Sequence, residues 1–300
     1  MERVKLRRWQ LLRWRVGKEV ADLRGAEVVA VGKRAFAGQV RLEEVLMPPT
    51  LSVIKTAAFA DCARLHTVTL DRQNAVGLAA DAFRDCVRLR TVAGSEMLSV
   101  IGNNAFTGCR NLRQVPFGRD LRRMGDGAFS GCTALESVTL PSCAERFGSG
   151  VFAGCTELTD VTLEPGLTLL GEGMFRGDIA LRVPEFPESL RALPAEVFRD
   201  CSAFSQLNLP GSLRSVGRNA FRGCVRLRAV SAGLGLTEIG AFAFAGCRDL
   251  EVVSLPHSLK KLRFGAFGLG FSRKKIRVLA DNEYMLKKLR SLFLRCGSLG

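Results

Sequence analysis

The sequence lacks most of the features that mark enzymes, metalloproteins and membrane proteins. Only two histidines occur in 300 residues, and the cysteines form no C-x-x-C pair, so the spacing of metal ligands is missing. No P-loop, G-x-S-x-G or H-E-x-x-H motif occurs, and no G-x-G-x-x-G follows a strand pattern. No apolar run reaches the ~18 residues of a membrane span, and no secretory signal follows Met1. We therefore expect no enzymatic activity, catalytic residue, metal, cofactor, small-molecule substrate or membrane span.

What the sequence has is self-similarity. A phenylalanine recurs every 23 residues, with one step of 24, at Phe36, Phe59, Phe83, Phe106, Phe129, Phe152, Phe175, Phe198, Phe221, Phe244 and Phe267. The residue five before each Phe is always apolar, Ala usually precedes the Phe, and Leu and Val dominate six and nine residues after it. Since several columns share one phase, the period belongs to a structural unit, L-x-x-I-G-x-x-A-F-x-G-C-x-x-L-x-x-V-x-L-P.

Each unit predicts one coil of a stack. The end of the segment Leu135–Leu140 alternates apolar and polar residues, which indicates a half-buried strand, and Pro141 ends it. The A-F-x-G-C part suits a tight turn or a single helical turn on the opposite side. A lone coil cannot bury its apolar side, so the coils stack, and each buried Phe contributes roughly 1.5–3 kcal/mol. We predict an α/β repeat solenoid of about eleven coils, with a parallel β-sheet on one face and terminal caps.

The repeat resembles the BspA-like leucine-rich repeats. Residues 216–227, V-G-R-N-A-F-R-G-C-V-R-L, are a near-ideal copy, and the resemblance covers about residues 28–280. It implies a leucine-rich-repeat fold and binding of proteins or surfaces, as in bacterial and protist surface adhesins, with no catalytic residues to carry over. Asp178 replaces the repeat cysteine, and Pro184 occupies the valine column. We expect a local bend or a widened strand spacing there.

The chain divides into three predicted parts. Residues 1–27 are a basic N-terminal cap, residues 28–280 the leucine-rich-repeat solenoid, and residues 281–300 a C-terminal capping helix and tail. Asp281, Asn282 and Glu283 predict the start of that helix, and Gly297 predicts its end. Between them, apolar residues recur at helical spacing at Met285, Leu286, Leu289, Leu292, Phe293 and Cys296. The pattern of the N-terminal cap fits either a helix or a strand.

The cysteines predict free, buried thiols. Eight of the ten stand three residues after a repeat Phe, in a column whose side chains point the same way about 4.8 Å apart, which does not suit a disulfide. We interpret them as small apolar groups that pack the turn. Reduced thiols favour an intracellular location, the cytoplasm or an organelle interior such as a mitochondrion or plastid. The missing export signal and N-glycosylation sequon weigh against an exported adhesin.

The net charge of +15 is concentrated at the two ends of the chain. Residues 1–34 hold ten Lys and Arg against four acids, and residues 259–300 hold eleven against two. The candidate contacts to an anionic partner are Arg7, Arg8, Arg13, Arg15, Lys260, Lys261, Arg273, Lys274, Lys275, Arg277, Lys287, Lys288 and Arg290. Trp9 and Trp14 are candidates for stacking on bases or entering a protein groove. The alternative is that charged caps only keep the ends of the stack soluble.

The outward strand positions, eight and ten residues after each Phe, form a second candidate surface. These positions carry small polar residues, and the candidates are Thr67, Thr69, Thr91, Gln114, Ser137, Thr139, Thr162, Gln206 and Asn208. Arginines at the repeat edge are better anchors, namely Arg64, Arg88, Arg90, Arg113, Arg226 and Arg228. A merely solvated polar sheet is the competing interpretation.

Together these patterns predict a non-enzymatic interaction scaffold, a subunit of a larger intracellular assembly that binds protein partners. Its basic ends would dock on an acidic or RNA-containing surface. Two alternatives remain open at this point: a cell-surface or secreted adhesion protein, and a ribosomal or other ribonucleoprotein subunit that contacts RNA through its basic caps.

Overall fold

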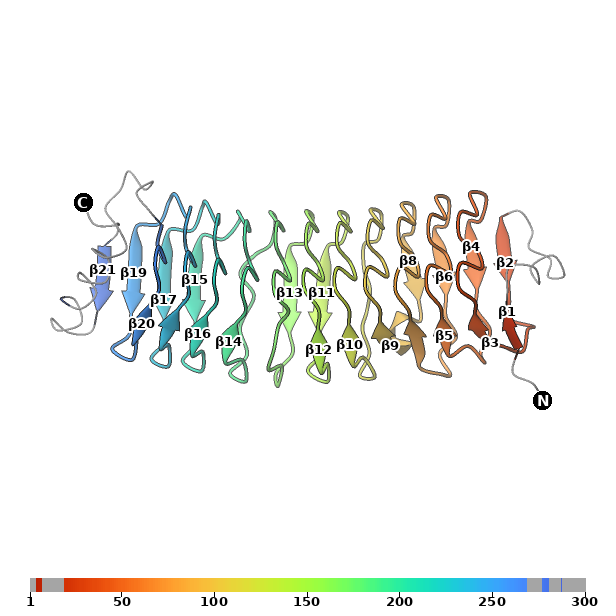
Figure 1. Ribbon diagram of the computed structural model, residues 1–300, viewed down its shortest axis with the longest axis horizontal. Helices are drawn as coiled ribbons and strands as arrows, with labels where there is room; N and C mark the ends of the chain where they lie inside the picture. The colour runs from red at the N-terminus through yellow and green to blue at the C-terminus, as the bar shows by residue number, and fades with distance from the viewer. Residues whose placement is uncertain (1–3, 7–18, 269–276, 281–286, 288–300) are drawn as a thin grey trace. The chain divides into compact units, whose positions relative to one another are not determined.

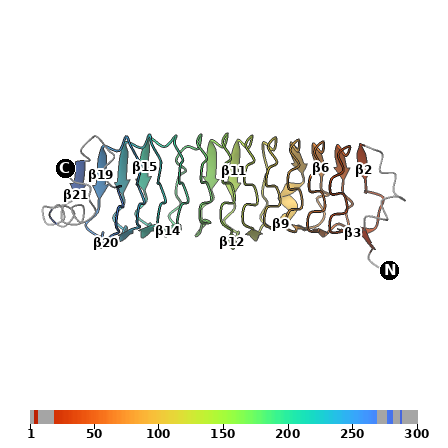
Figure 2. The ribbon, with the colours of Figure 1, turned by 45° about the horizontal axis from the view of Figure 1, so that its top comes forward.

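The computed structural model describes residues 4–6, 19–268, 277–280 and 287 of the chain, which divides into two compact units, residues 1–158 and 159–300. Within each unit the repeats are successive coils of a parallel β-solenoid, about eleven coils in the whole chain (Figure 1). Each regular coil contributes two short strands, one to each of two rows. Figure 2 shows the two rows on opposite sides of the coils.

The first row is built by the V-x-L part of the repeat. Its strands are β2 (Val20–Asp22), β4 (Glu44–Leu46), β6 (Thr67–Thr69), β8 (Thr91–Ala93), β11 (Ser137–Leu140), β13 (Asp160–Leu163), β15 (Gln206–Leu209), β17 (Ala229–Ala232), β19 (Val252–Leu255) and β21 (Arg277–Ala280). They pair in parallel and in register with the strand of the next coil, as β15, β17, β19 and β21 do in unit 2. The predicted parallel sheet is therefore confirmed.

The second row was not predicted. After β1 (Val4–Leu6), it is built by residues five to eight positions before a spine Phe and comprises β3 (Val28–Val31), β5 (Val53–Ile54), β7 (Val76–Leu78), β9 (Leu98–Ile101), β10 (Arg123–Met124), β12 (Arg146–Phe147), β14 (Ala192–Leu193), β16 (Ser215–Val216), β18 (Glu238–Ile239) and β20 (Lys261–Leu262). In the described ranges the only helix with defined bounds is the 3-10 turn η2 (Ser95–Met97). The expected α/β class with a sheet on one face is therefore wrong: strands form both sides of the coil.

The phenylalanine column fills the core of each unit, as predicted. All eleven rings are buried, and within each unit consecutive rings lie nearly parallel at short distances, 4.8 Å between the ring centroids of Phe36 and Phe59 in unit 1 and 5.2 Å between those of Phe221 and Phe244 in unit 2. We call these eleven residues the phenylalanine spine. Stacking at this distance adds to the free energy gained by burying the rings.

The A-F-x-G segment is a tight turn. Within each unit the spine N–H donates to the carbonyl of the residue before the next spine Phe, for example from Phe59 to Ala82 at 2.8 Å. Each described turn places a left-handed residue two positions before the Phe and, up to the coil of Phe244, a second one two positions after it. Glycine suits the second position, as at Gly108 (φ 74°), but the first also holds Phe242 (φ 57°).

The first row is interrupted in two coils. No first-row strand forms in the coils of Phe106 and Phe175, although both are fully described. Their first-row segments contain Pro116 and Pro184, and proline cannot donate a hydrogen bond to the strand ladder. The coil of Phe175 also lacks a second-row strand, so both rows are broken there, while the bend or widened strand spacing expected around Pro184 stays a prediction.

The predicted caps are only partly described. In the N-terminal segment, β1 pairs with β3 and β2 pairs with β4, so its described residues adopt strands. The expected C-terminal helix over 281–300 lies outside the described residues except for Lys287, and the structure gives it no support. Before it, β21 extends the first row of unit 2.

Candidate functional site

The outward positions of the first-row strands form one candidate surface. Burial alternates along β11, β13 and β15, so that every second side chain is exposed while its neighbours fill the core. On β11, Ser137 and Thr139 face outward and Val138 and Leu140 are buried. The alternation predicted from the sequence is therefore confirmed, and it places a row of neutral hydroxyl and amide groups on each unit.

Most of the predicted sheet-face residues lie where the sequence placed them. Those that share an exposed outward strand position are Thr91 (β8), Ser137 and Thr139 (β11), Thr162 (β13), and Gln206 and Asn208 (β15). Thr67 and Thr69 on β6 are half-buried, and the Thr67 hydroxyl lies 2.9 Å from His66 Nδ1. Gln114 is exposed but lies in the interrupted coil of Phe106, outside any strand. This surface therefore has a gap in unit 1.

Charged residues border this surface. Arg113 Nη1 lies 3.3 Å from Glu136 Oε1 in the next coil, and Arg182 Nη1 lies 3.4 Å from Asp160 Oδ1. Arg64 forms a longer contact, 3.9 Å, to Glu43. Because these pairs are exposed, each stabilises the fold by no more than about 1 kcal/mol. The other predicted edge anchors are exposed, namely Arg88, Arg90, Arg226 and Arg228.

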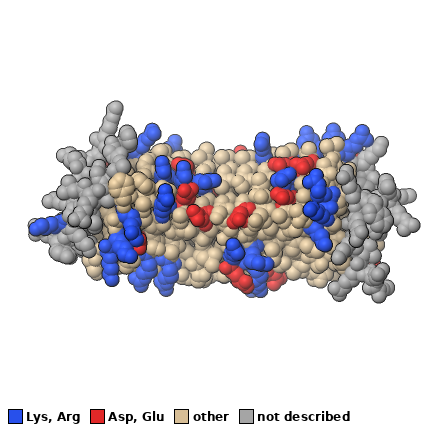
Figure 3. All heavy atoms as spheres, in the orientation of Figure 1, with Lys and Arg blue, Asp and Glu red and all other residues tan. Residues whose placement is uncertain are grey.

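Only part of the predicted basic surface can be placed. The exposed candidates are Lys260, Lys261, Arg277 and Lys287. Lys260 precedes β20, Lys261 begins it, and Arg277 begins β21. Glu238 lies 3.9 Å from Lys261 and 2.9 Å from Arg263. In Figure 3 blue side chains crowd the surface over β16 and β20. The remaining candidates lie outside the described residues: Arg7, Arg8, Trp9, Arg13, Trp14, Arg15, Arg273, Lys274, Lys275, Lys288 and Arg290.

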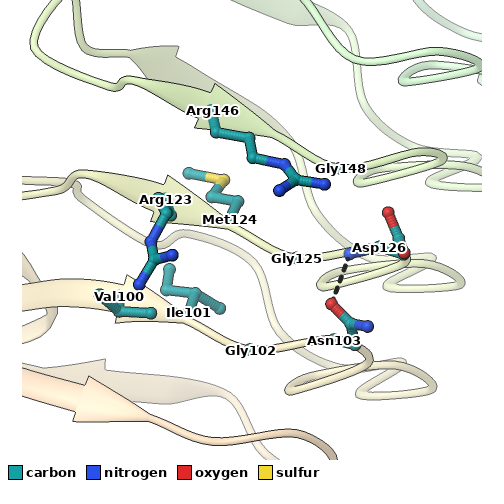
Figure 4. A pocket seen from close by; sticks show the side chains of 10 residues that line it. All are labelled: Val100, Ile101, Gly102, Asn103, Arg123, Met124, Gly125, Asp126, Arg146 and Gly148. Atoms are coloured by element: carbon teal, nitrogen blue, oxygen red, sulfur yellow. Dashed lines mark hydrogen bonds between the residues drawn. The ribbon is translucent and has the colours of Figure 1, made fainter.

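A hollow of about 390 Å³ opens on the second row of unit 1. Figure 4 shows Arg123 and Arg146 on one side of it, Asn103 and Asp126 on the other, and a run of glycines between them. The Asp126 N–H donates to Asn103 Oδ1 at 3.0 Å, and the Ser149 N–H donates to Asp126 Oδ1 at 2.8 Å.

This hollow was not predicted from the sequence. The signal that could have found it is the position six before the spine Phe, where arginine stands in two consecutive repeats. Small residues fill that position in several other coils, so the pair is a local departure from the repeat.

The thiol column is buried and free, as predicted. All nine cysteines of the described part are free, and the eight of the column are buried. Each of these eight donates to the carbonyl of the spine Phe one coil earlier, for example Cys109 Sγ to Phe83 O at 3.2 Å. Burial raises the pKa of the Cys109 and Cys132 thiols well above the ordinary value and raises that of Cys247 to about 12. These thiols are therefore poor nucleophiles.

Clusters of metal ligands and membrane-spanning helices are two further features that bear on function. Among the described residues, no three His, Cys, Asp or Glu side chains gather as the ligands of a metal ion would. In the same part of the chain, no helix has the length and apolar character needed to cross a membrane.

The two rows of short parallel strands, the buried apolar column and the 23-residue period define a leucine-rich-repeat solenoid. Residues 25–96, 76–205 and 191–289 match the model of the BspA type leucine rich repeat region in six copies, and the chain belongs to this family. A comparison with curated proteins found no match.

Several solved leucine-rich-repeat proteins are similar to this chain. One is a leucine-rich repeat protein from Bacteroides ovatus ATCC 8483, at 22% identity over 84% of this chain and 85% of that one, with a TM-score of 0.43. Another comes from Eubacterium ventriosum ATCC 27560, at 14% identity over 83% and 89%, with a TM-score of 0.46. A leucine rich cell surface protein from Faecalibacterium prausnitzii A2-165 is 19% identical over 87% and 85%, with a TM-score of 0.38.

Proposed function

We propose that this protein is a non-enzymatic interaction scaffold that binds a protein partner along the outward side chains of its first-row strands. Membership of a leucine-rich-repeat family supports a binding role. The observation that carries the proposal is the row of exposed hydroxyl and amide groups, such as Thr139, Thr162 and Asn208, on parallel strands. Such groups can pair with the polar backbone of an extended segment without burying a charge.

A matched pair of threonines tests this use of the face. Thr162 lies on β13, whereas Thr168 is an equally exposed threonine six residues further along, outside the first row. An arginine in place of Thr162 or Thr139 blocks close approach of a partner, so we expect T162R and T139R to reduce partner recovery by about fivefold or more in affinity capture. T168R should recover the partner as the unchanged chain does. Equal recovery by all three variants would refute this use of the face.

The finer proposal is that the scaffold belongs to an intracellular assembly and that its basic ends dock on an acidic or RNA-containing partner. The exposed Lys260 and Lys261 and the charge of the two ends support docking. The buried, free thiol column supports a reducing compartment. The alternative from the same family, a cell-surface or secreted adhesion protein, would instead carry an export signal, and its cysteines would be oxidised.

Charge reversal tests the docking. Replacing Lys274, Lys275, Arg277, Lys287 and Lys288 with glutamate should lower recovery of the assembly at moderate salt, because each removed phosphate or carboxylate contact weakens the salt-sensitive part of binding. The control is R110E/R119E, which reverses charge at two exposed residues of unit 1 outside the candidate surfaces. Nuclease treatment separates RNA from protein: recovery that survives nuclease argues for an acidic protein. Unchanged recovery after charge reversal would exclude docking through the C-terminal basic residues.

A further inference from the structure

The hollow on the second row of unit 1 brings two like charges together. Arg123 on β10 and Arg146 on β12 are in-register partners of paired parallel strands, so their backbones lie about 4.8 Å apart. Both side chains are exposed, and within the described residues no carboxylate lies within 4.0 Å of either guanidinium. Like charges at paired positions destabilise a sheet. A bound anion between the two guanidiniums would remove this repulsion.

The floor of the hollow is fixed by backbone. Gly102, Gly125 and Gly148 occupy the same repeat position in three consecutive coils, and a Cβ on any of them would clash with the backbone of the preceding coil. Their lack of side chains lets consecutive coils approach closely along the floor between the arginines and the opposite wall. Because the glycines are held by the stacked coils, the hollow exists before a ligand arrives, which lowers the entropic cost of binding.

The charges around the hollow select the kind of ligand. Asp126 lines its far wall and is the carboxylate among the lining residues. A nucleic-acid backbone, with its closely repeated phosphates, would meet this carboxylate as well as the arginines. A peptide with isolated acidic side chains can place a carboxylate at the arginines and keep its other groups away from Asp126. The mixed charge therefore favours a peptide.

We propose that this hollow binds an acidic segment of a protein partner, with a glutamate or aspartate carboxylate held between Arg123 and Arg146. A paired arginine site suits a carboxylate because each guanidinium offers several N–H donors in one plane. The proposal rests on the proposed scaffold function and adds a second binding surface, on the row opposite the first-row strands.

The test measures binding of a defined probe by the whole chain. The probe is a rhodamine-labelled peptide of glutamates separated by glycine and serine, followed by fluorescence anisotropy at low salt. We expect R123Q/R146Q to weaken its affinity about tenfold, since two charge-assisted contacts are lost. D126N should tighten binding about twofold, because it removes a repulsive carboxylate while its side-chain oxygen can still accept the Ser149 N–H. The matched control K33Q/R34Q, with the same loss of charge at two exposed residues of unit 1, should change the affinity by less than about twofold.

Three outcomes would overturn the proposal. An equal loss in K33Q/R34Q would show that the probe responds only to net charge. A D126N variant that binds the probe more weakly would place the carboxylate elsewhere. An oligouridylate whose binding falls in R123Q/R146Q while peptide binding stays constant would assign the hollow to nucleic acid. T139R and T162R should leave peptide binding unchanged, so a failure of the first-row proposal can be told apart from a failure of this one.

Discussion

At the scale of single residues, the repeat cysteine has a role beyond filling space. Each thiol of the column donates to the carbonyl of the spine Phe one coil earlier, as Cys132 does to Phe106 at 3.2 Å and Cys224 does to Phe198. The Phe106 carbonyl also accepts the Cys109 backbone N–H at 3.1 Å, so the thiol is its second donor and uses its remaining acceptor capacity. The sequence predicted a small buried thiol, but not its hydrogen bond, because the period alone does not show which group of the neighbouring coil a side chain meets.

The buried thiols predict a loss of stability at alkaline pH. Burial raises the pKa of Cys109, Cys132, Cys201 and Cys224 and takes that of Cys247 to about 12, against 9.0 for an ordinary thiol. Above pH 9.0 the unfolded chain releases these protons while the folded chain retains them. The linkage therefore leaves stability intact below pH 9.0 and lowers it progressively as the pH rises toward 12.

Denaturant midpoints in reducing buffer at pH 7.5, 9 and 10 measure this effect. Other groups also titrate in this range, so the comparison is between the chain and its variant C247A, which lacks one of the thiols. The midpoint of C247A should fall less steeply with pH than that of the unchanged chain. C143S, at a half-buried cysteine outside the column, should keep the original slope. If the denaturant midpoint falls with pH along parallel curves for all three proteins, the pH dependence cannot be assigned to the buried thiols.

At the scale of elements, the sequence predicted one row of strands and missed the other. The first row shows its alternation over three or four residues, as in Ser137–Leu140, and a proline or glycine often follows it. Many second-row strands are only two residues long, such as β10 and β12, and two residues cannot display a period. The helical turn considered for the far side of the coil is a tight turn instead, and the strands that enter it complete the second row.

The candidate surfaces, like the strands, could be predicted from the sequence only in part. The polar outward residues of β11 and β15 could be predicted because their exposure follows from the alternation. The hollow beside Arg123 and Arg146 could not, because it depends on strands that the pattern did not reveal and on which arginines become neighbours across coils. Departures from the repeat mark both irregular places: Pro184 lies in the coil that forms no strand, and a doubled arginine lies at the hollow.

At the scale of the whole molecule, the 23-residue period determines how stability is distributed. Each coil contacts its neighbours in the stack and no distant coil, so the free energy of unfolding is a sum of coil and interface contributions. The ring of Phe221 illustrates this, because it stacks on Phe198 at 5.6 Å and on Phe244 at 5.2 Å. A defect in one coil should therefore weaken the adjacent coils first.

Hydrogen exchange followed by mass spectrometry can show directly whether a defect in one coil weakens the adjacent coils first. Phe221→Ala removes a fully buried ring at a cost of about 3–5 kcal/mol and should raise amide exchange in the coils of Phe198, Phe221 and Phe244. The coils of unit 1 should keep their protection, because none of them touches the altered coil. Phe264→Ala, at an exposed ring, is the matched control and should change exchange little. A uniform loss of protection along the chain would mean that the solenoid unfolds as one cooperative body, and stability could then no longer be assigned coil by coil.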